Sequence, residues 1–318
     1  MDKLQKNQPN RSKPMKKWGK ALDFFSYLAI IKANDARIAS KKAKKAAPLQ
    51  EGCGRHFYHY KMGRLKAMEY RIEKDSIGER EVPVDAYYGV QSLRGAENFH
   101  ITGQKLQPEF INSMAEIKKA CAICNCMVGE MDEKIKDAIC QACDEIIAGQ
   151  FHDQFLCDPI QGGAGTTANM NANEVIANRA IEILGGKKGD YSIVHPNDHV
   201  NRAQSTNDVF PSAAKLTAAK LLKKAIAQLE RLEAALGQKE EEFHNIIKMG
   251  RTQMQDAVPI RLGSEFGAYR KAIQRDLVRL NRALEGMYAV NMGGTAVGTA
   301  LNANPAYVDA LAPELAKI

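Results

Sequence analysis

No apolar stretch of this sequence is long enough to cross a membrane. The longest apolar run, from Phe24 to Ile31, falls far short of the roughly 20 residues that a membrane-spanning helix needs. Basic residues precede this run as in a signal peptide, but Asp23 interrupts it and no clean small-residue cleavage site follows. The seven cysteines cannot all pair, and an odd count without a secretory signal favours a reducing compartment. We therefore expect a cytoplasmic protein.

A uniform positive charge is also missing. Residues 1–70 hold 17 Lys and Arg against 5 Asp and Glu, whereas the remainder holds 28 against 32. The formal charge of +8 therefore belongs to the leading segment alone, and the main body has no electrostatic reason to bind nucleic acid. We interpret residues 1–67 as a basic extension that is disordered or not native, with Met68 a natural start. Binding of nucleic acid or membrane through residues 1–66 is the alternative for that segment.

Four of the cysteines have a spacing that also suits zinc. Cys121 and Cys124, followed by Cys140 and Cys143, form two C-x2-C pairs separated by fifteen residues. Apolar residues recur around both pairs at helical spacing, with a break near Gly129. Because a free thiol packs like a small apolar side chain, we interpret the pairs as buried positions on two antiparallel helices and expect no metal.

Helix breakers are nearly missing from one long stretch in the second half of the sequence. An apolar stripe runs from Leu216 to Phe243 with one glycine and no proline, and a second runs from Phe266 to Met287. Stripes of this length are typical of bundle helices. The stretch MGRTQMQDAVP predicts a turn between the two helices, and NMGGTAVGTALNANP predicts a glycine-rich loop after the second. A long helix must bury its stripe, so we expect part of its cover to come from other subunits.

Three clusters of small polar residues interrupt this helical pattern. They are GGAGTT (162–167), QSTNDV (204–209) and GRTQMQDAVP (250–259), and each is predicted to lie at the edge of a helix. Backbone N–H groups at helix N-termini lack partners and can bind an anion. The neutral hydroxyls and amides of these clusters suit a carboxylate, although helix capping alone would also explain any single cluster. The candidate binding residues are Thr166, Thr167, Ser205, Thr206, Asn207, Thr252 and Gln253.

Together with their flanking residues, these clusters resemble the aspartase/fumarase superfamily. The motifs that carry the resemblance span about residues 69–318 and read DAYYGVQSLRGAENF, QGGAGTTANMNANEVIANRA, HPNDHVNRAQSTNDVFP, GRTQMQDAVPIRLGSEF and GGTAVGTALN. Class II fumarases have a motif similar to GSGTQ-x-NMN where this chain has GGAGTTANMN. They also tend to have a Thr-His pair where this chain has Thr252-Gln253. The likeness is therefore greater to the aspartase branch, with class II fumarase as the alternative.

The resemblance implies a mainly α fold of the aspartase/fumarase type. A small mixed N-terminal domain over residues 68–207 would be followed by a central long-helix bundle domain over residues 208–318. That bundle is expected to be incomplete here, and the C-terminal domain to be absent from this chain. Four copies would form a homotetramer whose active sites each combine clusters from different subunits.

The implied reaction is the reversible deamination of L-aspartate to fumarate through an aci-carboxylate. By resemblance, Ser205, Thr206 and Thr252 would receive the carboxylate next to the departing proton. Thr166 and Asn207, helped by Gln253, would position the ammonium group, and a neutral Gln suits that role because a cation would repel it. No cofactor or metal is expected, since the substrate's own carboxylate takes the charge. No partner other than the small-molecule substrate and further copies of the chain is implied.

One family motif has no counterpart in this sequence. The superfamily carries its proton-abstracting serine on a GSS-I-M-P-x-K-x-N-P loop, whereas the only Gly-Ser here, Gly263-Ser264, continues as EFG. We therefore expect the base serine beyond Ile318, name no catalytic residue within the chain and expect it to be inactive alone. A non-catalytic scaffold fragment of the same fold is the remaining alternative.

Overall fold

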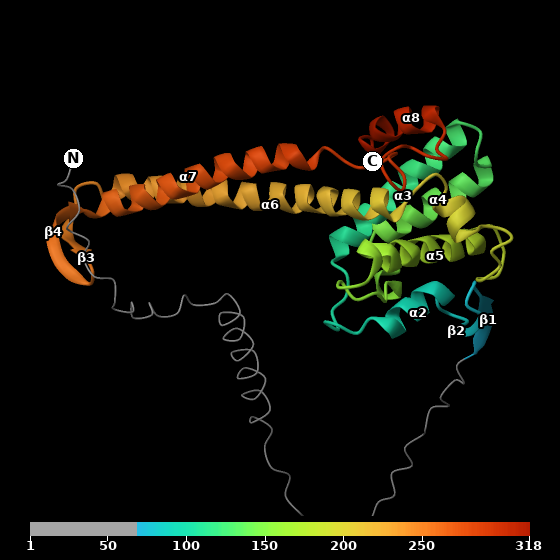
Figure 1. Ribbon diagram of the computed structural model, residues 1–318. Coiled ribbons are helices and arrows are strands. Elements are labelled where there is room, and N and C mark those ends of the chain that lie inside the picture. Colours follow the sequence, from blue (N-terminus) through green and yellow to red (C-terminus); the bar gives the residue numbers. More distant parts are fainter. Residues whose placement is uncertain (1–68) are drawn as a thin grey trace, which may run out of the picture. The chain divides into compact units, whose positions relative to one another are not determined.

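The computed structural model describes residues 69–318, and they form one mainly helical unit (Figure 1). The predicted mainly α fold class is confirmed, because short hairpins are the only sheet structure among these residues. The interpretations of residues 1–67, including the apolar run Phe24–Ile31 and the basic extension, lie outside the described residues. The proposed domain boundary at residue 207 stays a prediction.

The described chain begins with a small mixed layer. Strand β1 (Tyr70–Lys74) pairs antiparallel with β2 (Glu79–Pro83), and Tyr70 lies opposite Pro83. Helix α2 (Val90–Asn98) follows and has no side-chain cap of its own. A buried carboxylate from another helix, Glu174, accepts hydrogen bonds from the N–H groups at its start instead. Residues distant in sequence therefore fix the orientation of α2.

The two cysteine pairs lie on helices, as the sequence predicts. Helix α3 (Pro108–Met127) begins with a capping Gln107 and a proline at its first turn, and α4 (Glu133–Ile147) begins at the N-cap Asp132. Left-handed Gly129, with φ 77°, ends the first helix near the predicted break. Cys121, Cys124 and Cys143 are buried in the apolar core, and burial raises the pKa of the Cys121 thiol to about 12. These thiols are packing groups.

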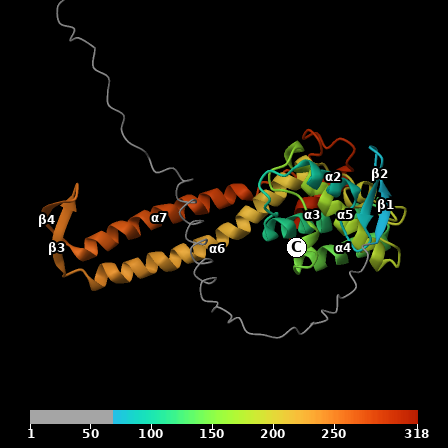
Figure 2. The same ribbon diagram turned by 90° about the horizontal axis from the view of Figure 1, so that it is seen from below.

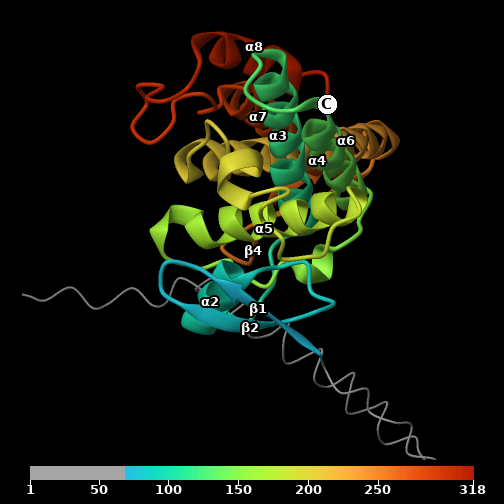
Figure 3. The same cartoon turned by 90° about the vertical axis from the view of Figure 1, so that its right-hand side faces the viewer.

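Helix α5 (Thr166–Ile183) lies at the centre of the compact part. It ends at Ile183, just before Gly185, whose left-handed φ is 82°. Figure 3 shows the order of layers, from β1, β2 and α2 through α5 to α3 and α4, with α8 (Pro305–Leu315) beyond them. The apolar core lies between these helices and includes Met114, Ile139 and Ile176, all fully buried.

The two long stripes form two long helices, α6 (Thr206–Glu242) and α7 (Leu262–Met287), packed along one another (Figures 1 and 2). Only the first part of α6 packs on α3 and α5, and no residue of α6 after Ile226 is buried. We call the rest of α6, together with α7 and the hairpin between them, the arm. Both stripes are confirmed as helices, and within the described residues the arm has little cover beyond its own two helices.

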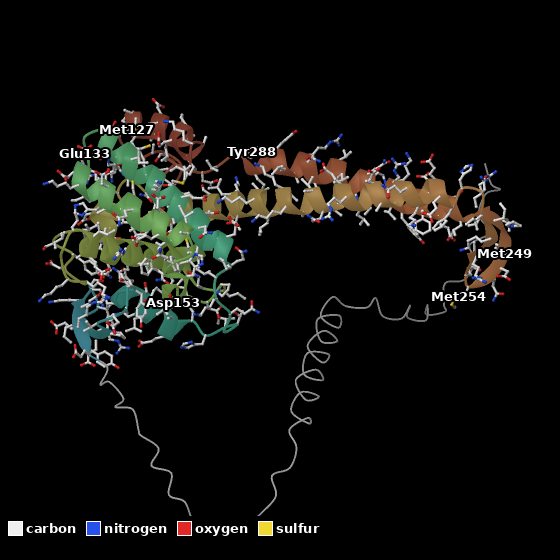
Figure 4. All side chains as sticks on the ribbon, turned by 180° about the vertical axis from the view of Figure 1, so that it is seen from behind. Met127, Glu133, Asp153, Met249, Met254 and Tyr288 are labelled. Atoms are coloured by element: carbon white, nitrogen blue, oxygen red, sulfur yellow. The ribbon has the colours of Figure 1, made fainter. Side chains whose placement is uncertain are left out.

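The connection between the long helices differs from the expectation. The stretch predicted as a turn contains two strands, β3 (Ile247–Thr252) and β4 (Gln255–Arg261), which pair antiparallel with an irregularity between Met249 and Arg251. The reason lies in Gln253 and Met254, whose φ angles of 53° and 61° make a tight two-residue turn that aligns the flanking residues as strands. Figure 4 shows Met254 at the tip of this hairpin.

The glycine-rich stretch after α7 is a loop, as predicted, and α8 follows it. Helix α8 begins at the N-cap Asn304 and packs on α3 through Tyr307 and Leu311, which are both buried. None of the helices within residues 69–318 combines the length and apolar character required to span a bilayer.

Candidate functional site

The first polar cluster forms the entry to α5. Gly163, Ala164 and Gly165 all have left-handed backbone conformations, with φ values of 65°, 52° and 97°. A side chain at Gly165 would lie 2.1 Å from the ring of Phe210, so the loop packs directly on the first turns of α6. Thr166 is exposed, and its hydroxyl donates to the Gly163 carbonyl oxygen at 2.6 Å. In this arrangement the Thr166 proton serves the loop itself.

The second cluster begins α6 with a reciprocal cap. The Ser205 hydroxyl oxygen accepts a hydrogen bond from the Asn207 N–H at 3.2 Å, and the Asp208 carboxylate accepts from the Ser205 N–H at 3.0 Å. The capping interpretation weighed for this cluster is therefore correct for Ser205. Capping does not use the whole group, because the Ser205 hydroxyl donates its proton to no acceptor among the described residues.

The hydroxyl of Thr206 is held from the side of α5. Its oxygen accepts a hydrogen bond from the Asn169 side-chain amide at 3.4 Å. Among residues 69–318 the Thr206 hydroxyl, like that of Ser205, has no acceptor for its own proton. The start of α6 therefore presents two hydroxyl donors beside the start of α5, and the first two sequence clusters come together within one chain.

Asn207 links the same helix start to the glycine-rich loop. Its side-chain amide donates to the Ala296 carbonyl oxygen at 2.8 Å, and the side chain is exposed. In that loop the buried Thr295 has a left-handed φ of 58° and a hydroxyl without a partner. The glycine-rich stretch, to which the sequence assigned no residue role, thus forms one wall beside the α6 start.

The third cluster does not join the others within one chain. Thr252 ends β3 and Gln253 begins the hairpin turn, so the expectation that this cluster lies at a helix edge is wrong. The 37 residues of α6 separate Thr206 from the hairpin, a distance of about 55 Å at 1.5 Å per residue. Both side chains are exposed at the far end of the arm. Their predicted participation in a common site requires a second copy of the chain.

The strongest electrostatic feature near the α6 start is a buried charged group that the sequence analysis missed. Lys118, on α3, is fully buried and donates to the side-chain oxygens of Asn201 at 2.7 Å and Gln204 at 2.9 Å. Burial lowers the pKa of Lys118 to about 7 and raises that of Asp208, which lies in the first turn of α6. A lysine four residues after Met114 and three before Cys121 falls on the buried face of the helix, a signal that the sequence did contain.

This arrangement can bind a carboxylate through neutral donors. Ser205 and Thr206 offer two hydroxyl protons at a helix N-terminus, where the unpaired backbone N–H groups also favour an anion. Across residues 69–318, no group of three or more His, Cys, Asp and Glu side chains is arranged to hold a metal ion. The chemistry open to these residues is hydrogen bonding to an anionic substrate.

Comparison with known sequences points to one family. A model of the family described as Lyase matches residues 78–318. The chain is 55% identical to the aspartate ammonia-lyase of Bacillus subtilis over 250 residues, which are 79% of this chain and 53% of that protein. The aspartate ammonia-lyase of Escherichia coli is 44% identical over 78% of this chain and 52% of its own length. The chain thus spans about half the length of the curated relatives that it matches.

Solved structures agree with the sequence comparison. A fumarate lyase/delta crystallin structure from Brucella melitensis, with bound cobalt, superposes with a TM-score of 0.76 at 47% identity, over 78% of this chain and 55% of that one. A class II fumarase from Schistosoma mansoni superposes with a TM-score of 0.75 at 38% identity, over 78% and 53% of the two chains. The polar clusters, the long paired helices and these similarities agree: the chain belongs to the aspartase/fumarase superfamily of lyases.

Proposed function

We propose that the protein functions in the reversible deamination of L-aspartate to fumarate and ammonia. The observation that carries the proposal is the pair of unused hydroxyl protons of Ser205 and Thr206 at the start of α6. The relatives named aspartate ammonia-lyase, at 44% and 55% identity, support aspartate as the substrate. Thr166 and Asn207 are adjacent candidates for the ammonium end.

The reaction explains why neutral donors are required. Removing a proton from the carbon next to a carboxylate produces a doubly charged aci-carboxylate, and this species forms only where its charge is stabilised. Preorganised hydrogen-bond donors supply such stabilisation, and the loss of one donor typically lowers the rate by about 10² to 10³. No described residue is assigned the role of the base.

We also propose that the protein works as a homotetramer that brings the hairpin of one copy to the α6 start of another. Large apolar side chains along the arm are exposed, including Leu232, Tyr269, Val278 and Val258, and a surface of this kind favours association. The turn residues Gln253 and Met254 have left-handed backbone conformations, which are unfavourable for residues other than glycine. Such strain is typical of functional positions. A tetramer would allow Thr252 and Gln253 to complete the carboxylate and ammonium site.

A cytoplasmic location is part of the same proposal. Six free cysteines lie in the described part of the chain, and four of them are buried. Thiols of this kind are consistent with a reducing compartment. Localisation of the tagged protein by fractionation would check this point.

An activity assay tests the main proposal. The purified chain is incubated with L-aspartate, alone and mixed with the C-terminal half of the Bacillus subtilis relative, and fumarate is followed by its absorbance. Fumarate should form in the mixture, and the rate of its formation should fall at least about 10²-fold with Thr206→Val. L-malate is the parallel substrate, and greater activity on malate would contradict the proposal in favour of a fumarase. The absence of activity in tetrameric mixtures would contradict it as well.

The oligomeric state is tested separately by light scattering after gel filtration. The wild-type chain should form a species of four 35.1 kDa subunits. Leu232→Lys places a charge on the exposed stripe of the arm and should shift the population towards smaller species, whereas Glu230→Lys, on an exposed position two residues earlier, serves as the matched control. Equal behaviour of the two variants would argue against the arm as the interface.

A further inference from the structure

Lys118 occupies an unusual environment for a cation. Its side chain is fully buried on α3, and the described residues place no carboxylate within ion-pair distance of it. Its ammonium group instead donates to two neutral amide oxygens, those of Asn201 and Gln204. A buried charge held only by neutral groups is costly, so the orientation of those groups is strongly constrained.

The ammonium group fixes the direction of the hydrogen bonds around it. In its protonated form it carries three donors and no acceptor, so the side-chain oxygens of Asn201 and Gln204 must face it. The amide nitrogens of both residues then point away and donate to backbone carbonyl oxygens of the same loop, Asn201 to Gln204 and Gln204 to Val200 and Arg202. A flip of either amide would place N–H groups against the buried cation.

Asn169 extends this direction to the candidate site. Its side-chain nitrogen donates to the Asn201 oxygen at 3.2 Å and to the Thr206 hydroxyl oxygen at 3.4 Å. Because a lone pair of the Thr206 oxygen is engaged from inside, the single hydroxyl proton is left to point to an acceptor outside the core. The network therefore begins at a group that can only donate and ends at a hydroxyl free to donate.

The side-chain oxygen of Asn169 shows what the network prevents. This atom is buried and has no hydrogen-bond partner among the described residues. A flip of the Asn169 amide would bring the oxygen to Thr206, which would then donate its proton inward and become useless for binding an anion. The flip would also set the Asn169 oxygen against the Asn201 oxygen, which Lys118 holds in place. The oxygens of Asn169 and Asn201 would then both be acceptors with no proton between them, so the flipped state is disfavoured.

We propose that Lys118 is a positioning residue that acts through Asn201 and Asn169 to keep the Thr206 hydroxyl as a hydrogen-bond donor to the substrate carboxylate. This inference rests on the proposed function of Thr206 and deepens it. Lys118 touches no substrate atom in this scheme. Its charge fixes which way the neighbouring side-chain amides point. Such preorganisation removes the cost of reorienting the donor when negative charge develops.

The binding test uses the whole chain and fumarate as the probe, measured by calorimetry. Lys118→Met removes the origin of the network, and Thr206→Val removes its end. Each should weaken fumarate binding about tenfold, the loss expected for one hydrogen bond to a charged group. The double variant should bind no more weakly than Thr206→Val alone, because both changes remove the same donor. Additive losses, or wild-type affinity in Lys118→Met, would overturn the proposal.

A matched control and a milder variant separate positioning from folding. Lys119→Met changes the next residue of α3, an ion-paired lysine that lies outside the network, and should leave the affinity unchanged. Asn169→Ala cuts the link to Thr206 while Lys118 keeps both of its amide acceptors, so it should show the same tenfold loss even if Lys118→Met does not fold. Fumarate affinity unaltered by Asn169→Ala would contradict the proposed route.

A second measurement needs no ligand. In protein labelled with ¹⁵N-asparagine, hydrogen exchange of the Asn169 side-chain amide reports whether that group stays oriented. The exchange should accelerate in Lys118→Met and keep its wild-type rate in Lys119→Met, and identical slow exchange in both would overturn the inference. Failure of the wild-type chain to bind fumarate would count against the proposed function, while this exchange measurement would still decide the role of Lys118.

Discussion

The compact part of the molecule and the arm are both helical, but they bury their residues very differently. In α3, 11 of 20 residues are buried, whereas in α7 only Gly263 and Gly267 of 26 residues are. Helix α6 belongs to both regions, since all seven of its buried residues lie between Asp208 and Ile226. The compact part completes its core within one chain. The arm has the apolar stripe of a bundle helix but few buried residues, and this difference supports the proposal that further copies of the chain cover it.

The two regions also hold their polar groups differently. The compact part contains buried polar side chains with defined partners, such as Glu174 and Lys118, which fix the orientation of neighbouring backbone and amide groups. The ion pairs of the arm, such as Arg270 with Glu233, are partly exposed and contribute little to stability. Substitutions of the same type should therefore have large effects in one region and small effects in the other.

The largest difference is expected for glutamate to glutamine substitutions. Glu174→Gln replaces one of two carboxylate oxygens with a group that donates, where Oε2 accepts the Gly89 and Ser92 N–H groups and Oε1 accepts the Gln91 N–H group. At least one buried donor then loses its acceptor, and the free energy of unfolding should fall by about 3 kcal/mol. Glu230→Gln, at an exposed site of the arm, should change it by less than about 0.5 kcal/mol. Urea denaturation of both variants measures the contrast, and equal losses would refute it.

A smaller, pH-dependent effect should distinguish Lys118 from Lys119. In the unfolded chain Lys118 has an ordinary lysine pKa near about 10.4. In the folded chain burial lowers this pKa to about 7, despite the facing Cys121, Cys143 and Asp208. Between these values the unfolded state binds more protons, so Lys118 adds to the free energy of unfolding as pH rises from about 7 towards 10.

Denaturation at pH 7, 8 and 9 tests this linkage. The stability of the wild-type chain relative to Lys118→Met should increase across the series. Relative to Lys119→Met it should stay constant, because that partly exposed lysine forms an ion pair with Asp144 and stays protonated in both states over this range. A difference from Lys118→Met that stays flat, or that shrinks with pH, would show that burial does not lower the pKa of Lys118.

The smallest effect concerns the tip of the arm. Met254→Gly should raise the free energy of unfolding by about 1 kcal/mol, because glycine adopts the left-handed φ of 61° without strain. Gln253→Gly should stabilise the hairpin similarly but weaken aspartate binding in the tetramer, because it also removes the amide proposed to face the ammonium group. Thermal melts and calorimetry would compare the two variants. Equal aspartate affinities of Met254→Gly and Gln253→Gly would show that Gln253 does not contribute to the binding site.

Much of the fold follows from the spacing of apolar residues. The stripes from Leu216 to Phe243 and from Phe266 to Met287 predict the two long helices, and the apolar spacing around Cys121 and Cys143 predicts α3 and α4. The hairpin was missed because its turn holds Gln253 and Met254, where sequence patterns of two-residue turns lead one to expect glycine or asparagine.

Less of the site could be predicted from the sequence. The residue types at Ser205 and Thr206 indicate donors at a helix start, and the structure places both there. The sequence could not show that the Thr166 hydroxyl donates to the Gly163 carbonyl oxygen, because this hydrogen bond depends on the left-handed conformation of Ala164. The network of Lys118 was also out of reach, since Asn169 and Asn201 are 32 residues apart and meet only in the folded chain.

The unbroken helix α6 also sets a rule for how this protein can change in length. One inserted residue would advance the tip of the hairpin by about 1.5 Å and rotate it by about 100° about the helix axis. Both ends of the helix would then face different neighbours. Seven added residues make nearly two full turns and restore the direction to within about 20°. Insertions and deletions tolerated within α6 should therefore occur in steps of seven, because such steps nearly preserve the direction of the hairpin about the helix axis.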